Sequence, residues 1–289
     1  MTADSAGKTT EEGAMKAMTA ALVVFAVAHG ASFAQNSDAH SQGASSMNAV
    51  SPEIVKELAP TGRLRVAINL GNPVLAQADE KTGQPKGVTA DLAHELGRRL
   101  GVPVDLSTYD AAGKSFESLK AGKSDIVFLA IEPVRAAEVA FTAPYVIIEG
   151  VYMVPKDSPI KAVDQVDHDG VRIGVNKASA YDLYLSRTLK HAQLVRGDSG
   201  VDLFVQQKLD AAAGVKQPIV AYAKTNPDVR VLDGRFMEIR QAMGTVKGRD
   251  KAARYLHGFI EEMKASGFVA DALKRSNQPD ASVAPPAAP

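Results

Sequence analysis

The chain contains no cysteine. This absence excludes disulfides, thiol catalysis, cysteine-ligated zinc and a lipid-modified N-terminal cysteine, although it says little about the redox compartment. An excess of either charge is also missing, because Lys+Arg and Asp+Glu number 33 each and no basic stripe stands out. Nucleic-acid binding is therefore disfavoured. With 289 residues, of which 45% are hydrophobic, the chain can still bury a substantial core in one or two domains.

Long apolar runs are missing except for one near the N-terminus. Lys16 precedes an apolar run over residues 20–28, and small residues follow at Ser32 and Ala34. The run is too short for a comfortable membrane span and has the order of a secretory signal, rather than that of a buried or amphipathic helix. We expect residues 1–34 to be an N-terminal extension plus signal peptide, cleaved after Ala34, which predicts export to the periplasm. Translation starts at either Met1 or Met15.

Signatures of catalysis and of metal binding are missing as well. Segments 112–115 and 121–124 end like a phosphate-binding loop, but Thr108 and Glu117 replace the upstream glycine of that motif. The six histidines lack metal-ligand spacing, and no Gly-x-Ser-x-Gly elbow occurs. Nothing in the sequence demands an enzyme, and we expect neither a metal nor a cofactor.

The polar lead-in at 35–51, rich in Ser, Ala, Gly and Asn, is predicted to be a disordered linker, and the folded part begins near Pro52. Apolar patterning then predicts strands at 63–69, 102–106 and 126–131, with helices at 89–100 and 115–121 between them. The alternation of strand and helix predicts an α/β fold with a parallel sheet.

This plan recurs later in the chain. Residues 62–69 have an echo at 170–176, where a strand again ends in Asn, and residues 123–127 have one at 208–212. Two similar α/β units predict two lobes whose strand ends face a common cleft. The helix predicted at 250–266 is expected to pack back on the first lobe. The Pro- and Ala-rich tail, residues 277–289, is expected to be disordered.

The predicted site lies where the central buried strand ends. Glu132, Pro133 and Arg135 follow the apolar run Ile126–Ile131 directly. An acid, a helix-starting proline and a guanidinium suit a ligand site at the carboxyl edge of an open α/β sheet. Arg135 would offer a planar fork to a carboxylate. Taken alone, an arginine after a strand is more often a solvated surface charge.

Four segments, at 87–101, 119–125, 133–136 and 141–145, together resemble the family 3 extracellular solute-binding proteins. The resemblance covers residues 52–276. It implies a two-lobe, type II periplasmic-binding-protein-like fold, in which each lobe is a mainly parallel sheet flanked by helices. Lobe 1 would comprise 52–149 and 243–276, and lobe 2 would comprise 150–242. These proteins are soluble receptors of ABC importers, so an inner-membrane ABC permease is the implied partner of a monomer.

The resemblance also implies a set of ligand contacts. Arg135 falls where the family's arginine pairs with the ligand carboxylate. Asn69 and Asn72 lie in a loop that contacts ligand from below. Ser179 and Ala180 match a turn whose backbone amides meet the carboxylate from the opposite lobe.

Several positions depart from the family pattern. Ala130 stands where a Ser or Thr is usual, and Val215 stands where an acid holds the ligand's α-ammonium. Because a buried ammonium without an acceptor is costly, Glu132 is the obvious substitute, although a helix N-terminal acid is an equally good interpretation of that residue. Three further residues could supply neutral hydrogen bonds across the cleft, or could simply be exposed: Tyr181, Gln217 and Gln241.

The sequence therefore predicts a receptor that captures an amino acid or a related small carboxylate by closure of two lobes. Two alternatives stay open. The same fold serves as a secreted dehydratase acting on a cyclohexadienyl acid such as prephenate, in which Glu132 would be the general acid. It also serves as a ligand-binding sensory module that signals to a receptor.

Overall fold

The computed structural model describes residues 50–278 and 281–288. The expected signal peptide and linker, residues 1–34 and 35–51, thus lie outside the described residues apart from 50 and 51. The first element, α1 (Pro52–Leu58), begins after Ser51, whose side chain accepts a hydrogen bond from the backbone N–H of Ile54. A serine N-cap followed by proline at the first helical position explains this start. No helix in the described part is long and apolar enough to cross a membrane.

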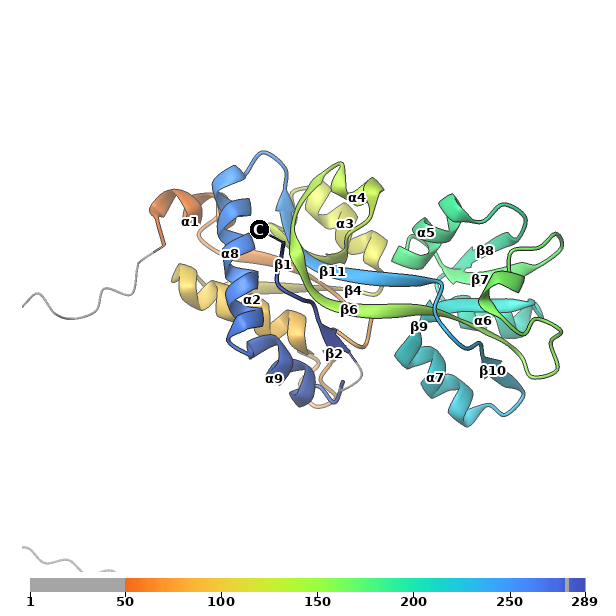
Figure 1. Ribbon diagram of the computed structural model, residues 1–289. Helices are drawn as coiled ribbons and strands as arrows, with labels where there is room; N and C mark the ends of the chain where they lie inside the picture. The colour runs from red at the N-terminus through yellow and green to blue at the C-terminus, as the bar shows by residue number, and fades with distance from the viewer. Residues whose placement is uncertain (1–49, 279–280, 289) are drawn as a thin grey trace, which may run out of the picture. The chain divides into compact units, whose positions relative to one another are not determined.

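One large mixed sheet forms the centre of the described region, with β4-β1-β5-β11-β6-β9-β7-β8 as its main order (Figure 1). The strands are β1 (Leu64–Asn69), β4 (Val104–Tyr109), β5 (Ile126–Ala130), β6 (Val139–Pro155), β7 (Arg172–Asn176), β8 (Gln193–Gly197), β9 (Ala211–Val215) and β11 (Met237–Val246). Strands β4, β1 and β5 are parallel, as are β8, β7 and β9. The long antiparallel pair β6 and β11 runs between these two groups (Figure 1).

Helices cover both faces of each parallel group. The first group carries α2 (Val88–Leu100), α3 (Ala112–Lys120), α8 (Asp250–Ala265) and α9 (Phe268–Arg275), and the second carries α5 (Ala180–Thr188), α6 (Gly200–Gln206) and α7 (Lys216–Thr225). Short elements complete the fold: β2 (Gln77–Ala78), β3 (Pro85–Lys86), α4 (Pro133–Ala136), the 3-10 turn η1 (Val163–Gln165) and β10 (Val229–Val231).

Strand β5 is buried along its whole length, as its uniform apolar sequence predicts. Phe128 belongs to the core that contains the inner faces of α2 and α8, whereas Val127 and Leu129 pack with Phe116 and Leu119 of α3. Because side chains alternate along a strand, a strand covered on both sides must be apolar at every position. The site that follows β5 is therefore built on a rigid support.

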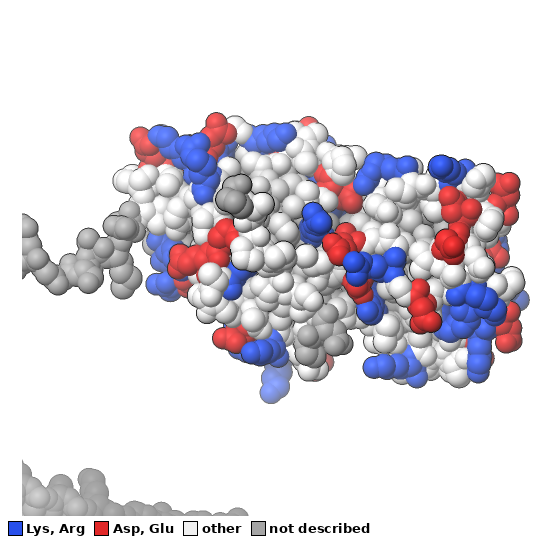
Figure 2. Space-filling view, in the orientation of Figure 1, with Lys and Arg blue, Asp and Glu red and all other residues white. Residues whose placement is uncertain are grey.

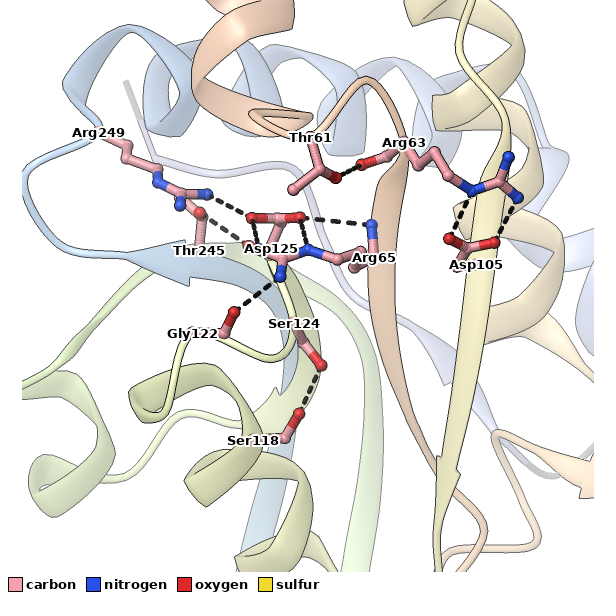
Figure 3. A network of polar contacts seen from close by, with 10 residues as sticks. All are labelled: Thr61, Arg63, Arg65, Asp105, Ser118, Gly122, Ser124, Asp125, Thr245 and Arg249. Atoms are coloured by element: carbon pink, nitrogen blue, oxygen red, sulfur yellow. Dashed lines mark hydrogen bonds and ion pairs between the residues drawn. The ribbon is translucent and has the colours of Figure 1, made fainter.

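The start of β5 is held by a buried ion-pair network (Figure 3). The carboxylate of Asp125 accepts hydrogen bonds from Nε and Nη2 of Arg65, at 2.8 and 2.9 Å, and from Nη1 of Arg249 at 3.1 Å. The hydroxyl of Thr245 donates to the Asp125 carbonyl at 2.9 Å. These contacts tie β1, β5 and β11 together at the edge of the sheet opposite the predicted site.

The pairing of β6 with β11 is irregular around Pro144. Gln241 lies opposite Val146, but Ala242 lies opposite Pro144, so that Tyr145 is an extra residue on β6. Proline cannot donate to the ladder, which favours a bulge at this point. The backbone N–H of Met243 donates instead to the Thr142 hydroxyl at 3.2 Å.

The chain's tail differs from the expectation of disorder over 277–289. In the described segment 281–288, β12 (Ser282–Val283) pairs with β6 at Ile147 and Val146, and the N–H of Ala284 donates to the Tyr145 carbonyl at 3.0 Å. Lys264 donates to the Pro285 carbonyl at 2.8 Å. The expectation is wrong for this segment because small side chains let the tail lie close against a strand that offers free backbone groups. Composition alone does not reveal such a partner.

Candidate functional site

A cavity of about 180 Å³ opens where β1, β5, β7 and β8 end and where β11 passes beneath them. Eight of the ten predicted site residues line it: Asn69, Asn72, Ala130, Arg135, Ser179, Ala180, Tyr181 and Gln241. They come from both parallel groups of the sheet. Carboxyl ends of parallel strands are the usual place for a ligand in open α/β sheets, and the cavity's size suits a small one.

Two predicted residues, Glu132 and Gln217, do not line this cavity. Glu132 is the N-cap residue of α4 and is buried, with Oε2 at 2.6 Å from Nη1 of Arg187 in α5. Its carboxylate is therefore engaged in an ion pair with Arg187. Gln217 lies in the first turn of α7 and lines a separate surface depression together with Lys224. Neither side chain is placed to contact a molecule in the cavity.

Arg135 is the one buried cation among the described residues that line the cavity. It is 1% exposed, and its guanidinium donates to the carbonyl of Ala130 at 3.2 Å and to that of Ala178 at 2.9 Å. No carboxylate in the described part of the chain forms an ion pair with it. Burial lowers the pKa of Arg135 to about 10, an effect that the more distant charge of Glu132 partly opposes. The group thus stays cationic at neutral pH, and a bound anion would offset the cost of burying it.

The beginning of α5 points additional donors at the same cavity. Ser179 is the N-cap, and its hydroxyl accepts from the N–H of Asp182 at 3.1 Å. The first two helical residues, Ala180 and Tyr181, line the cavity, and the N–H groups of such positions have no partner within a helix. A helix N-terminus favours negative charge. Arg135 and α5 therefore make this end of the cavity electropositive from two sides.

The remaining buried polar groups of the cavity are neutral. Asn72 and Gln241 are both buried, and the Asn72 Oδ1 atom has no hydrogen-bond partner in the described structure. Asn69, in contrast, is held by the backbone, because its Oδ1 accepts from the N–H of Gly71 at 3.0 Å. Burial raises the pKa of Tyr181 to about 12, so its hydroxyl keeps its proton at neutral pH. Asn72 is the lining residue with an unused buried acceptor.

The two sides of the cavity come close together at α3 and the loop before α5. A Cβ atom added to Gly113 would lie only 2.8 Å from the Cβ of Ala178, whose backbone has a left-handed φ of 57°. Real Cβ atoms do not approach so closely, so glycine at 113 permits this contact. Together with the Arg135–Ala178 hydrogen bond and the Glu132–Arg187 ion pair, it joins the two sides.

Sequence reasoning missed several lining residues: Asp110, Ala111, Ala112, Leu129, Asn176, Lys177, Gly197, Asp198 and Ile239. Gly71 lines the cavity as well, and so does Val215, which was considered above only as a departure from the family pattern. Asn176 and Asp198 lie at or just beyond the carboxyl ends of β7 and β8. The sequence echo between Asn69 and Asn176 could have indicated these positions, because equivalent strand ends of two similar units face one cleft.

Comparisons with a family model and with solved structures point to the same kind of protein. The model of the bacterial extracellular solute-binding proteins, family 3, matches residues 64–276. No curated protein matches the chain. Solved structures do match it: a mutant of ArgBP from T. maritima has 25% identity and a TM-score of 0.65, with 78% of this chain and 99% of that chain covered.

Two further structures show the same fold. The solute receptor for L-cysteine of Neisseria gonorrhoeae has 24% identity and a TM-score of 0.67, covering 78% of this chain and 94% of that one. AncCDT-1, an ancestral amino acid-binding protein and precursor of cyclohexadienyl dehydratase, has 24% identity and a TM-score of 0.63, covering 76% and 98%. The likeness confirms the predicted two-lobe type II periplasmic-binding fold.

Proposed function

Because the chain belongs to the bacterial extracellular solute-binding proteins of family 3, we propose that it is the receptor of an ABC importer and captures an amino acid or a related small carboxylate. The observation that carries this proposal is Arg135, a buried guanidinium at the cavity with no carboxylate partner in the described structure. Its planar fork suits a ligand carboxylate, and the amides at the start of α5 would meet the same group from the other side.

Capture would work by closure of two lobes. Lobe 1 comprises residues 52–149 and 243–276, lobe 2 comprises 150–242, and β6 and β11 connect them. A ligand that contacts both lobes binds the closed form better than the open one and shifts the population toward closure. The closed receptor would then dock on an ABC permease of the inner membrane as a periplasmic monomer.

The dehydratase alternative has a relative of the same fold in AncCDT-1. It needs an acid at the cavity. The residue expected for this role, Glu132, is paired with Arg187 and does not line the cavity, and the two acids that do line it, Asp110 and Asp198, are exposed to solvent. Binding without turnover is therefore the function that the geometry supports better.

Calorimetry of the purified protein with a panel of amino acids and small carboxylates tests the proposal. Arg135→Met should weaken binding of any ligand found by about 30- to 5,000-fold, because truncating one partner of a buried charge pair costs about 2–5 kcal/mol. Arg172→Met, which changes an exposed arginine outside the cavity, is the matched control. Unchanged affinity in a folded Arg135→Met protein contradicts the assignment.

A further inference from the structure

We propose that the cavity selects a small carboxylate whose other polar groups are uncharged, such as a 2-hydroxy acid, in preference to an α-amino acid. This inference rests on the proposed function and specifies its ligand class. It follows from which charges the cavity wall contains, which of them are already paired, and which neutral groups remain without a partner.

The cavity wall has no buried carboxylate among the described residues. Its charged members are Arg135, Lys177, Asp110 and Asp198, and of these only Arg135 is buried. Two buried acids, Glu132 and Asp182, are close in sequence to lining residues but do not line the cavity themselves. Glu132 is paired with Arg187 at 2.6 Å, and Asp182 with Arg196 at 2.8 Å. An ammonium group entering the cavity would thus find no buried counter-charge.

The two acids that line the cavity, Asp110 and Asp198, are exposed to solvent. The Asp110 carboxylate accepts a hydrogen bond from Nζ of Lys114 at 2.7 Å. That bond is the main reason why the pKa of Lys114 lies above its ordinary value, and the charge of Asp198 adds to the rise. Asp110 is therefore paired already, whereas Asp198 acts on Lys114 only through its charge and forms no ion pair among the described residues. A ligand ammonium could pair only with these two solvent-exposed acids, where water screens the charges and ion pairs are weak.

The electropositive end of the cavity would in addition repel an α-ammonium. In an α-amino acid the ammonium lies on the carbon next to the carboxylate, so a carboxylate held by Arg135 and the amides of α5 brings the ammonium close to the same positive groups. Like charges close together in a site of low dielectric are strongly unfavourable without a nearby acid. A hydroxyl in the same position carries no such penalty.

The neutral groups of the wall match a hydroxyl. The Asn72 Oδ1 atom is buried and has no hydrogen-bond partner in the described structure. A carboxamide carries both acceptor and donor atoms, and a hydroxyl can donate to one and accept from the other. Gln241 offers a second buried carboxamide at the cavity. Filling the unused acceptor of Asn72 removes a cost that the ligand-free protein bears.

The test compares ligands that differ only in this group. Calorimetry of the purified protein would use L-lactate against L-alanine, and L-2-hydroxyisovalerate against L-valine, at neutral pH. We expect the hydroxy acid of at least one pair to bind tenfold or more tightly than its amino acid. Tighter binding of the amino acids, with loss in Arg135→Met, would overturn this inference and leave the proposed function standing. If none of these four ligands binds, this inference is overturned as well. The proposed function is then still tested by the wider panel of amino acids and small carboxylates.

A second arm restores the missing charge. Val215 lines the cavity at the end of β9 and is the N-cap position of α7, where aspartate is well tolerated. Val215→Asp should lower the hydroxy-acid preference at least tenfold, whereas the neutral, similarly shaped Val215→Asn should not. An equal preference in wild type and both folded variants would show that a missing counter-charge does not set selectivity.

Discussion

The ion pair between Glu132 and Arg187 joins the two sides of the cavity, and its removal gives a quantitative test of closure. Glu132 is 3% exposed, while the Arg187 side chain is 39% exposed, and the two approach to 2.6 Å. In Arg187→Met the Glu132 carboxylate would stay buried in the closed form without a partner. When the two sides separate, water can reach it. The substitution therefore penalises the closed form specifically.

The size of the effect follows from the burial of the two partners. Breaking a fully buried pair costs about 3–5 kcal/mol, but the exposure of Arg187 reduces this to about 1–3 kcal/mol. Ligand affinity should accordingly fall by about 5- to 150-fold. A change in the ligand-free ensemble toward more open forms should accompany it, because the same pair holds both sides without ligand.

Calorimetry measures the affinity, and small-angle X-ray scattering measures the radius of gyration with and without ligand. Arg172→Met is the control, because this side chain is similarly exposed, at 43%, but its partner Asp210 is 3.9 Å away in the same parallel group. It should change affinity less than twofold. Adding Glu132→Gln to Arg187→Met should recover part of the loss, since it removes the buried charge. Wild-type affinity and scattering in Arg187→Met would refute the reasoning.

Two further predictions concern stability. Asp125→Asn should lower the free energy of unfolding by about 2–4 kcal/mol in urea denaturation, because it removes the buried carboxylate that two arginines share; Asp105→Asn, in an exposed pair, should cost less than about 1 kcal/mol. Equal losses would contradict this account. Hydrogen bonds from Arg98 and then Arg99 hold the carboxyl pKa of Glu95 down at about 2, against an ordinary value of 4.5. Because the folded value is the lower one, this stabilisation is present above about pH 4.5 and is lost as the pH falls toward 2. Melting temperatures across this range should fall less steeply for Glu95→Gln, and identical acid limbs would show that the pairing contributes nothing.

The parts of the fold that local patterns determine could be predicted from the sequence. An unbroken apolar run predicted β5, and the rule that ligands bind at carboxyl strand ends placed Arg135 at the cavity. The echo between the two α/β units predicted that their strand ends face one cleft, and Asn69 and Asn176 both line it. These inferences succeed because periodicity and strand direction are encoded within a few residues.

Features that depend on distant partners could not be predicted. Nothing near Glu132 in the sequence indicates that Arg187, 55 positions later, would pair with it. The tail at 281–288 has a disorder-like composition, and its order depends on a neighbouring strand more than 130 residues earlier. Whether Gln217 reaches the cavity depends on which face of α7 is turned toward it. The sequence indicates that face only weakly, because few residues of this helix are buried.

The mixture of charges at the surface agrees with the balanced composition. On the face shown in Figure 2, lysines and arginines alternate with acids over both parallel groups, and no field of one sign dominates. Recognition by long-range attraction of a polyanion is not favoured by such a face. This face therefore offers no long-range source of selectivity beside the short-range contacts within the cavity.

The irregular register around Pro144 is the place where we expect the strand pair β6 and β11, which connects the two parallel groups, to bend. A strand pair bends most easily where its ladder of hydrogen bonds is already interrupted, and bulges increase the local twist. Gln241 sits directly beside this interruption and also faces the cavity. Bending of this strand pair would therefore move a side chain that would contact the ligand. A ligand bound to Gln241 would in turn restrict bending of the pair.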